Sequence, residues 1–197
     1  MAGHPARLMK AMELHVKNQT KRDKEPIFPV TTDYIQREER IATVWMAFIW
    51  DAGFAVNTCW SQSMDLHEVM CNLPTSVADL QKGINSDQGN PQSPESPDLF
   101  SNHPICDSFV LAVKASILLS RVNKFIMAWM QRKIVPGDDL AGLQMPEYLQ
   151  LVNDIRAFQC SIPGAMNSVF KHRDSQAASP FEAHLLVRTL SILPIKD

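Results

Sequence analysis

Two short clusters carry residue types that could do chemistry. His67 and Cys71 are four residues apart, a spacing that on a helix places an imidazole and a thiol on one face, as in half of a zinc site. No third ligand stands nearby, so a partly exposed histidine beside a buried thiol is the favoured interpretation. Asp138 and Asp139 could hold Mg²⁺ in a helical enzyme, but they follow a proline-glycine turn without a third carboxylate. We expect them to be solvated turn residues.

Other chemical motifs are incomplete. The segment 137–142 has the two glycines of a phosphate loop but lacks the lysine that would reach the phosphates, and no G-x-S-x-G elbow is present. The four cysteines, at 59, 71, 106 and 160, form no C-x-x-C pair, which excludes a compact zinc module and a dense disulfide framework. We therefore expect no catalytic residue, no cofactor and no metal in this chain, and no enzymatic activity.

Two further patterns have an ordinary and a functional interpretation. The tryptophans and methionines could line a ligand cavity, although such residues more often fill a helical core; they are Trp45, Trp50, Trp60, Trp129, Met46, Met127 and Met130. A basic run over 17–24 could contact DNA, but a solvated linker is favoured.

The composition is that of one globular domain. The chain has 197 residues, 45% of them hydrophobic and 20% charged, with a net charge of −2. This balance argues against a disordered chain and against a chain-wide basic surface for nucleic acid. The most apolar stretch, 109–130, is interrupted by Lys114, Arg121 and Lys124, which makes a membrane span unfavourable.

The elements that must position these residues are helices. Apolar residues recur at helical spacing in 5–17, from Asp33 past Trp50, in 66–73, in 107–134, in 146–162 and in 179–193, and no strand pattern appears. Asp33 and Gln36 form a predicted capping box. The core-facing seam of the long helix is Leu111, Ala115, Leu118, Val122, Phe125 and Trp129. We predict one all-α domain over 1–197 with about six to eight irregularly packed helices. The proline-rich segment 85–104 is predicted to be a disordered, flexible loop.

Several segments, in this order, resemble the fungal-specific transcription factor domain, the middle homology region of fungal zinc-cluster transcription factors. Residues 6–15, ARLMKAMELH, are similar to its A-x-R-x-A-x-x-L-G-L-H helix, with Glu13 where the family usually has glycine. Residues 37–51, REERIATVWMAFIWD, look like its E-x-R-R-R-x-F-W-x-x-F-x-x-D-R signature, with Ala52 in place of the last arginine. The stretch 64–74 leads to a similar Leu-Pro, and 149–163 and 183–186 resemble its later helices.

The resemblance implies a regulatory role without catalysis. Its signature residues are expected to be structural: Arg7, His15, Arg40, Trp45, Phe48, Asp51, Leu73 and Pro74. Arg40 and Asp51 lie too far apart on one helix to pair, so each is expected to meet another helix, with Arg7 and His15 as candidate partners.

In the family, DNA binding and zinc belong to a separate six-cysteine cluster that this sequence does not contain. The resemblance therefore implies a nuclear domain that controls transcription by RNA polymerase II through protein partners, a second copy of itself or a small effector. Direct contact with nucleic acid or membrane is not expected. Two alternatives remain: a truncated paralogue that acts as a dimerisation partner or inhibitor, and, remotely, a Mg²⁺-dependent helical enzyme using Asp138 and Asp139.

Overall fold

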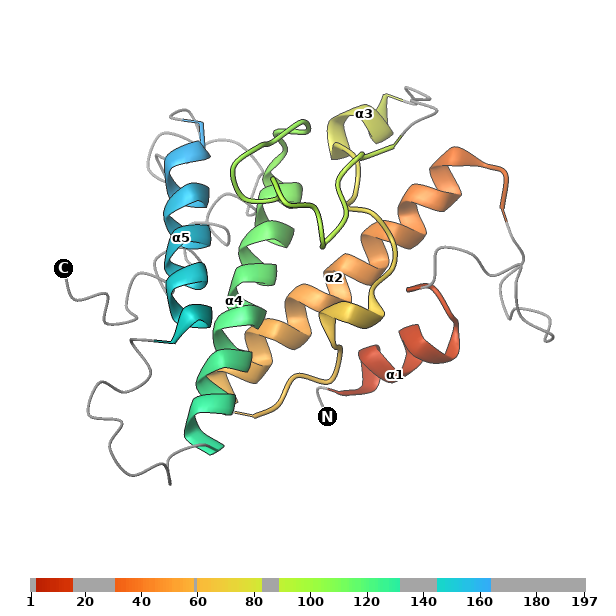
Figure 1. The fold of residues 1–197 in the computed structure, drawn as a ribbon. Helices are drawn as coiled ribbons and strands as arrows, with labels where there is room; N and C mark the ends of the chain where they lie inside the picture. Colours follow the sequence, from red (N-terminus) through yellow and green to blue (C-terminus); the bar gives the residue numbers. More distant parts are fainter. Residues whose placement is uncertain (1–2, 16–30, 59, 83–88, 132–144, 164–197) are drawn as a thin grey trace, which may run out of the picture.

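The computed structural model describes residues 3–15, 31–58, 60–82, 89–131 and 145–163 (Figure 1). These residues are all-α, as predicted, and include no β-strand. They form α1 (Gly3–Ala11), α2 (Tyr34–Thr58), α3 (Val77–Gln81), α4 (Ser108–Gln131) and α5 (Pro146–Ser161), with a 3-10 helix at Leu66–Glu68. None of the helices in this described part combines the length and apolarity that a membrane crossing requires. The predicted helix 179–193 lies outside the described residues.

The central element is α4, which lies between α2 and α5 (Figure 1). Every residue from 110 to 120 is buried, because helices or loops cover this part of α4 on all sides. The predicted seam is confirmed over its described side chains: Leu111, Ala115, Leu118 and Val122 are buried, and Phe125 is partly buried.

Helix α2 supplies the second half of the core. It begins where predicted, because Asp33 Oδ1 accepts the Ile35 N–H at 3.0 Å. The reciprocal bond of the predicted capping box is replaced, since the Asp33 N–H donates to Thr31 Oγ1 at 3.1 Å and not to Gln36. Its inner face buries Val44, Trp45 and Phe48 completely, and the last two rings meet edge to face at 5.5 Å. The helix continues through Gly53 to Thr58.

Helix α1 ends earlier than the predicted residue 17, in a Schellman turn. The Glu13 N–H donates to Lys10 O at 3.1 Å and the Leu14 N–H donates to Met9 O at 3.2 Å. Glu13 occupies the turn position that requires a left-handed backbone, and its φ is 55°. Glycine is the usual residue there because a Cβ is strained in this conformation.

We expect Glu13→Gly to raise the free energy of unfolding by about 1 kcal/mol, because glycine removes the left-handed strain. Urea unfolding of both proteins measures the difference. Glu39, exposed within α2, provides a control of opposite sign, since Glu39→Gly should lower stability by about 1 kcal/mol. A loss of stability in both variants would show that Glu13 is not strained.

The predicted amphipathic helix over 66–73 is wrong beyond its first turn. Asp65 forms a capping box with Glu68, but the helix stops there and Val69 is extended, with φ −85° and ψ 96°. The backbone beyond it finds partners elsewhere: the Met70 N–H donates to His15 O and the Leu73 N–H donates to Gln92 O, both at 2.9 Å. Tertiary hydrogen bonds therefore replace the helical ones.

The predicted disordered loop over 85–104 is wrong for residues 89–104, which pack onto the core. The segment buries two large apolar side chains, Leu99 and Phe100. Its polar side chains pair with backbone groups, since Asn90 Nδ2 donates to Pro74 O at 2.9 Å and Gln92 Nε2 donates to Asn102 O at 3.2 Å. These side-chain hydrogen bonds satisfy backbone carbonyl groups that would be paired within a regular helix or sheet. Residues 85–88 lie outside the described residues.

Candidate functional site

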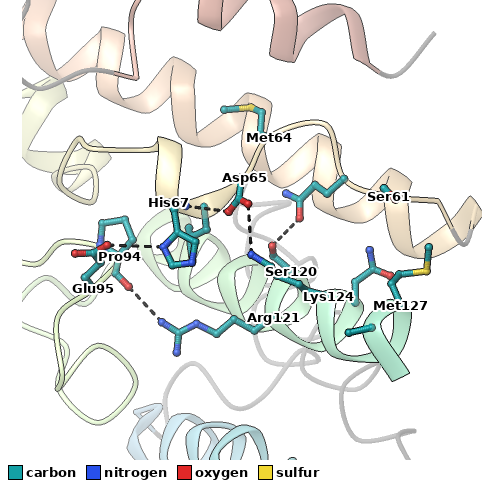
Figure 2. Close-up of a pocket in the computed structure, with 14 residues that line it drawn as sticks. Ser61, Met64, Asp65, His67, Pro94, Glu95, Ser120, Arg121, Lys124 and Met127 are labelled. Carbon is teal, nitrogen blue, oxygen red and sulfur yellow. Dashed lines mark hydrogen bonds and ion pairs between the residues drawn. The ribbon is translucent and has the colours of Figure 1, made fainter. Parts of the chain in front are cut away.

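A cleft of about 520 Å³ lies between α4 and the segment that follows α2 (Figure 2). Residues 61–67 form one wall, residues 120–128 of α4 form the other, and Pro94 and Glu95 complete the lining. Volumes of this size are typical of small-molecule sites. We define the residues 60–75, which include the first wall, as the wall segment.

Helix α2 fixes the wall segment through two buried side chains. Asp51 Oδ2 accepts the backbone N–H groups of Ser63 and Met64, at 2.8 and 2.7 Å. Trp45 Nε1 donates to Asn72 O at 2.8 Å. Because both side chains are almost completely buried, these hydrogen bonds are shielded from water and hold the backbone of the segment in place.

A second carboxylate on α2 contacts the end of the wall segment. Glu38 is buried, and its Oε2 accepts the Thr75 N–H at 3.2 Å. Burial raises the pKa of Glu38, while the Thr75 hydrogen bond and the neighbouring Arg37 act in the opposite direction. Gly89, with φ +54°, lies against this carboxylate, where a Cβ would approach Glu38 Oε1 to 3.1 Å.

Helix α1 contacts the same segment from another side. Lys10 Nζ forms an ion pair with Glu68 at 2.6 Å and donates to Ser63 O at 3.3 Å. The hydrogen bond from Lys10 lowers the pKa of Glu68. The wall segment is therefore tied to both α1 and α2.

The opposite wall contributes polar side chains from α4. Ser120 Oγ donates to Gln62 Oε1 at 2.6 Å, and Lys124 Nζ lies 3.4 Å from Asp65 Oδ2 (Figure 2). A hydrogen bond from the His67 backbone N–H lowers the pKa of Asp65, and the Lys124 charge lowers it further. Asp65 is therefore a carboxylate at neutral pH and pairs with the Lys124 ammonium.

A second polar cluster lies outside the cleft, under the segment 98–104. Lys114 on α4 is completely buried, and its Nζ donates to Asn102 O at 2.7 Å and to His103 Nδ1 at 2.9 Å. His103 Nε2 meets Ser161 Oγ at 2.8 Å, and Ser161 Oγ donates to Phe100 O at 2.8 Å. The chain of hydrogen bonds joins α4, the loop and the end of α5.

The direction of these hydrogen bonds shows what the cluster can do. Burial and the neighbouring Lys114 charge lower the pKa of His103 to about 4, so the ring is neutral. Its Nδ1 accepts from the Lys114 ammonium, which places the ring proton on Nε2, where it is donated to Ser161. In this arrangement His103 cannot take the proton of Ser161. The two residues are of the types found in a nucleophile and its general base, but their hydrogen bond runs in the opposite direction.

Because Lys114 is buried, we predict an unusual dependence of stability on pH. Burial lowers the pKa of Lys114 to about 8 from 10.5, its ordinary value. Between about pH 8 and about pH 10.5 the unfolded chain holds a proton that the folded chain has lost, so the free energy of unfolding rises with pH. We expect Lys114 to contribute a rise of about 2–3 kcal/mol over this interval.

Comparison with Lys114→Met separates this contribution from that of other groups. Urea unfolding across the alkaline range is measured for both proteins, and the variant is subtracted from the wild type. The difference should rise with pH; a difference independent of pH would mean that Lys114 keeps an ordinary pKa in the folded protein.

The structure brings most of the signature residues to the wall segment. Trp45 and Asp51 bind it directly, His15 O accepts a hydrogen bond from its Met70 N–H, and Leu73 and Pro74 are buried within it. Phe48 is a core residue. The expected partner of Asp51 on another helix is wrong, because backbone N–H groups occupy its carboxylate.

The two arginines among the signature residues, Arg7 and Arg40, have other surroundings. Arg7 is exposed on α1, and Arg40 Nη2 donates to Gln36 Oε1 at 3.4 Å within α2. Asp51 instead accepts the backbone N–H groups of Ser63 and Met64.

The candidate metal ligands do not form a site. His67 belongs to the 3-10 helix and is exposed, whereas Cys71 lies beyond its end and is buried, so the two share no helical face. Within the described ranges no three His, Cys, Asp or Glu side chains are grouped to hold a metal ion. Asp138, Asp139 and the glycine loop 137–142 lie outside the described residues.

Among the candidate cavity residues whose side chains the structure describes, Met127 is the one that lines the cleft, and the side chains of Trp129 and Met130 lie outside this described part. Trp45 is in the core, and Trp50 and Trp60 are exposed. The polar contacts of α4 come from the three charged residues that interrupt the most apolar stretch of the sequence, Lys114, Arg121 and Lys124. Charges on an otherwise apolar helix were the signal, because a charge that packs into a protein needs polar partners.

No protein-family model, curated protein or solved structure matches this chain.

Proposed function

We propose that this chain is a regulatory domain of a fungal transcription factor. It acts in the nucleus, it binds protein partners or a small effector, and it controls transcription by RNA polymerase II without catalysing a reaction. DNA binding is assigned to a zinc cluster of the kind found in the family, separate from these residues.

The proposal rests on one observation: several of the signature residues contact the same part of the chain, the wall segment. Trp45 and Asp51 come from the segment that resembles the most specific family motif, and both bind the wall segment. His15 closes the other similar motif and contacts the same segment through its carbonyl oxygen. Residues spaced far apart in the sequence thus share one role, which is to position one wall of a cleft.

The backbone at Glu13 supports the same proposal. This residue stands where the resembling family usually has glycine, and its φ of 55° is the conformation that favours glycine. The position requires a left-handed turn whichever residue occupies it. The turn then directs His15 O towards the Met70 N–H.

The cleft supplies a physical basis for regulation. Its wall segment contacts α1 through Lys10, α2 through Asp51 and α4 through Ser120 and Lys124. A molecule bound in the cleft would therefore change contacts to three helices at once. Such shared contacts allow binding at one site to shift the equilibrium of a distant surface.

A reporter assay tests the proposal. The chain is fused to an unrelated DNA-binding domain in a fungal cell, and transcription from the matching promoter is compared with that of the DNA-binding domain alone. We expect the fusion to change transcription by about fivefold or more, the lower end of common regulatory coupling. Equal output, with both proteins present in the nucleus at equal amounts, would contradict the proposal.

A further inference from the structure

The rim of the cleft carries charges of both signs at one point. Lys124 Nζ and Asp65 Oδ2 lie 3.4 Å apart, and their side chains remain 64% and 48% exposed. An exposed pair of this kind contributes at most about 1 kcal/mol, so a ligand can replace each partner at little cost. The arginine of the lining, Arg121, already pairs with Asp154 at 3.0 Å and donates to Pro94 O at 3.3 Å.

The walls beside this pair are largely apolar. Five lining residues have apolar side chains: Met64, Leu66, Pro94, Met127 and Ala128. Two of them are methionines, whose flexible side chains adapt to ligands of different shape. Figure 2 shows Met127 on α4 beyond Lys124, and Met64 next to Asp65 with its side chain directed towards α2.

One hydrogen-bond donor in the lining lacks a partner. Gln62 Oε1 accepts from Ser120, but Gln62 Nε2 is buried and has no partner among the described residues. Buried donors in folded proteins are nearly always paired, so an unpaired one in the wall of a cleft favours a ligand with an acceptor oxygen.

Ligands with a single charge fit this rim poorly. An anion that approached Lys124 would meet Asp65 and Glu95, and a cation that approached Asp65 would meet Lys124. A ligand with both charges on neighbouring atoms would instead pair with Lys124 and Asp65 at the same time.

We propose that the cleft binds a free α-amino acid with an apolar side chain. This inference deepens the proposed function, on which it rests, by naming the effector of the regulatory domain. The carboxylate pairs with Lys124 and accepts from Gln62 Nε2 after a small side-chain shift, and the ammonium group pairs with Asp65. Both charged groups of an α-amino acid are attached to one carbon, which suits two protein charges 3.4 Å apart. The side chain lies against Met64, Leu66 and Met127.

Calorimetric titration of the whole chain tests the ligand class. The probes are L-leucine, L-methionine and L-phenylalanine, compared with N-acetyl-L-leucine, L-leucinamide and leucyl-leucine. We expect saturable binding of the free amino acids and at least about tenfold weaker binding of the three derivatives, which lack one charge or separate the two charges. No binding of the free amino acids at millimolar concentration would overturn the inference. Equal or tighter binding of any derivative would also overturn it, and preference for leucyl-leucine would indicate a peptide site.

Two variants locate the site. Lys124→Gln and Asp65→Asn should each weaken leucine binding by about tenfold or more, whereas the exposed Lys82→Gln, outside the cleft, should leave it unchanged. Unchanged affinity in Lys124→Gln and Asp65→Asn would contradict the location. The two proposals fail separately: an active reporter fusion without amino-acid binding contradicts only the ligand class, and binding without reporter activity contradicts only the role in transcription.

Discussion

Replacement of Trp45 by alanine is expected to lower the free energy of unfolding by about 3–5 kcal/mol. The indole is completely buried between α2 and the rest of the core, and its Nε1 donates to Asn72 O. Alanine would leave a cavity and would remove the hydrogen bond from the indole to Asn72 O, and both effects destabilise the folded state. Because small domains are stable by only about 5–15 kcal/mol, this loss would remove a large part of the total.

Two matched variants identify the cause. Trp45→Phe keeps most of the ring but loses the hydrogen bond, and we expect a smaller loss of about 1–2 kcal/mol. Trp50, on the same helix, is 70% exposed, and Trp50→Ala should change stability by less than about 0.5 kcal/mol. Urea unfolding gives all three values. Equal losses in Trp45→Ala and Trp50→Ala would contradict the described packing of α2.

Asp51→Ala is expected to lower the free energy of unfolding by about 2–5 kcal/mol. The substitution removes the single oxygen that accepts from both Ser63 N and Met64 N, and each buried N–H left without a partner costs about 1–3 kcal/mol. Asp51→Asn retains an acceptor oxygen of similar geometry, so we expect it to lose about half as much or less.

Amide hydrogen exchange gives Asp51 a local readout. The Ser63 and Met64 amides should exchange faster in Asp51→Ala than in the wild type, relative to amides in the centre of α4. Protection that falls equally at all sites would indicate global destabilisation without a specific role in the wall segment. Loss of stability with unchanged exchange at these two amides would contradict the assigned hydrogen bonds.

The long helices could be predicted from the sequence because their local pattern and their tertiary role agree. In α4 the spacing of Leu111, Ala115, Leu118 and Val122 gives both the helix and its buried seam. In α2 the Asp33 cap and the stripe through Val44 and Phe48 do the same.

The segments between the helices could not be predicted because long-range partners decide their structure. Leu66, Val69 and Leu73 have helical spacing, yet Trp45 and Gln92 bind the backbone beyond residue 70. The composition of 85–104 suggested disorder, but Leu99 and Phe100 anchor the described part of it in the core. Local propensity was outweighed by tertiary contacts in both cases.

The cleft was not visible in the sequence for a related reason. Its walls come from segments about sixty residues apart, and Ser120 meets Gln62 only in the folded chain. The family resemblance predicted structural roles for Trp45 and Asp51, and both side chains are buried and hydrogen-bonded to the wall segment. The prediction that Asp51 pairs with a side chain on another helix was wrong. A sequence pattern does not show which backbone N–H groups a distant loop brings to a carboxylate.

The most direct test of the central claim compares three fusions to an unrelated DNA-binding domain in the same cell: wild type, Lys124→Gln and Lys82→Gln. Lys124 lines the cleft and Lys82 does not, and both are exposed enough that their substitution should leave the fold intact. We predict that the wild type and Lys82→Gln change reporter transcription by about fivefold or more, and that Lys124→Gln loses most of this change. Output from all three fusions equal to that of the DNA-binding domain alone would contradict a regulatory role for this chain.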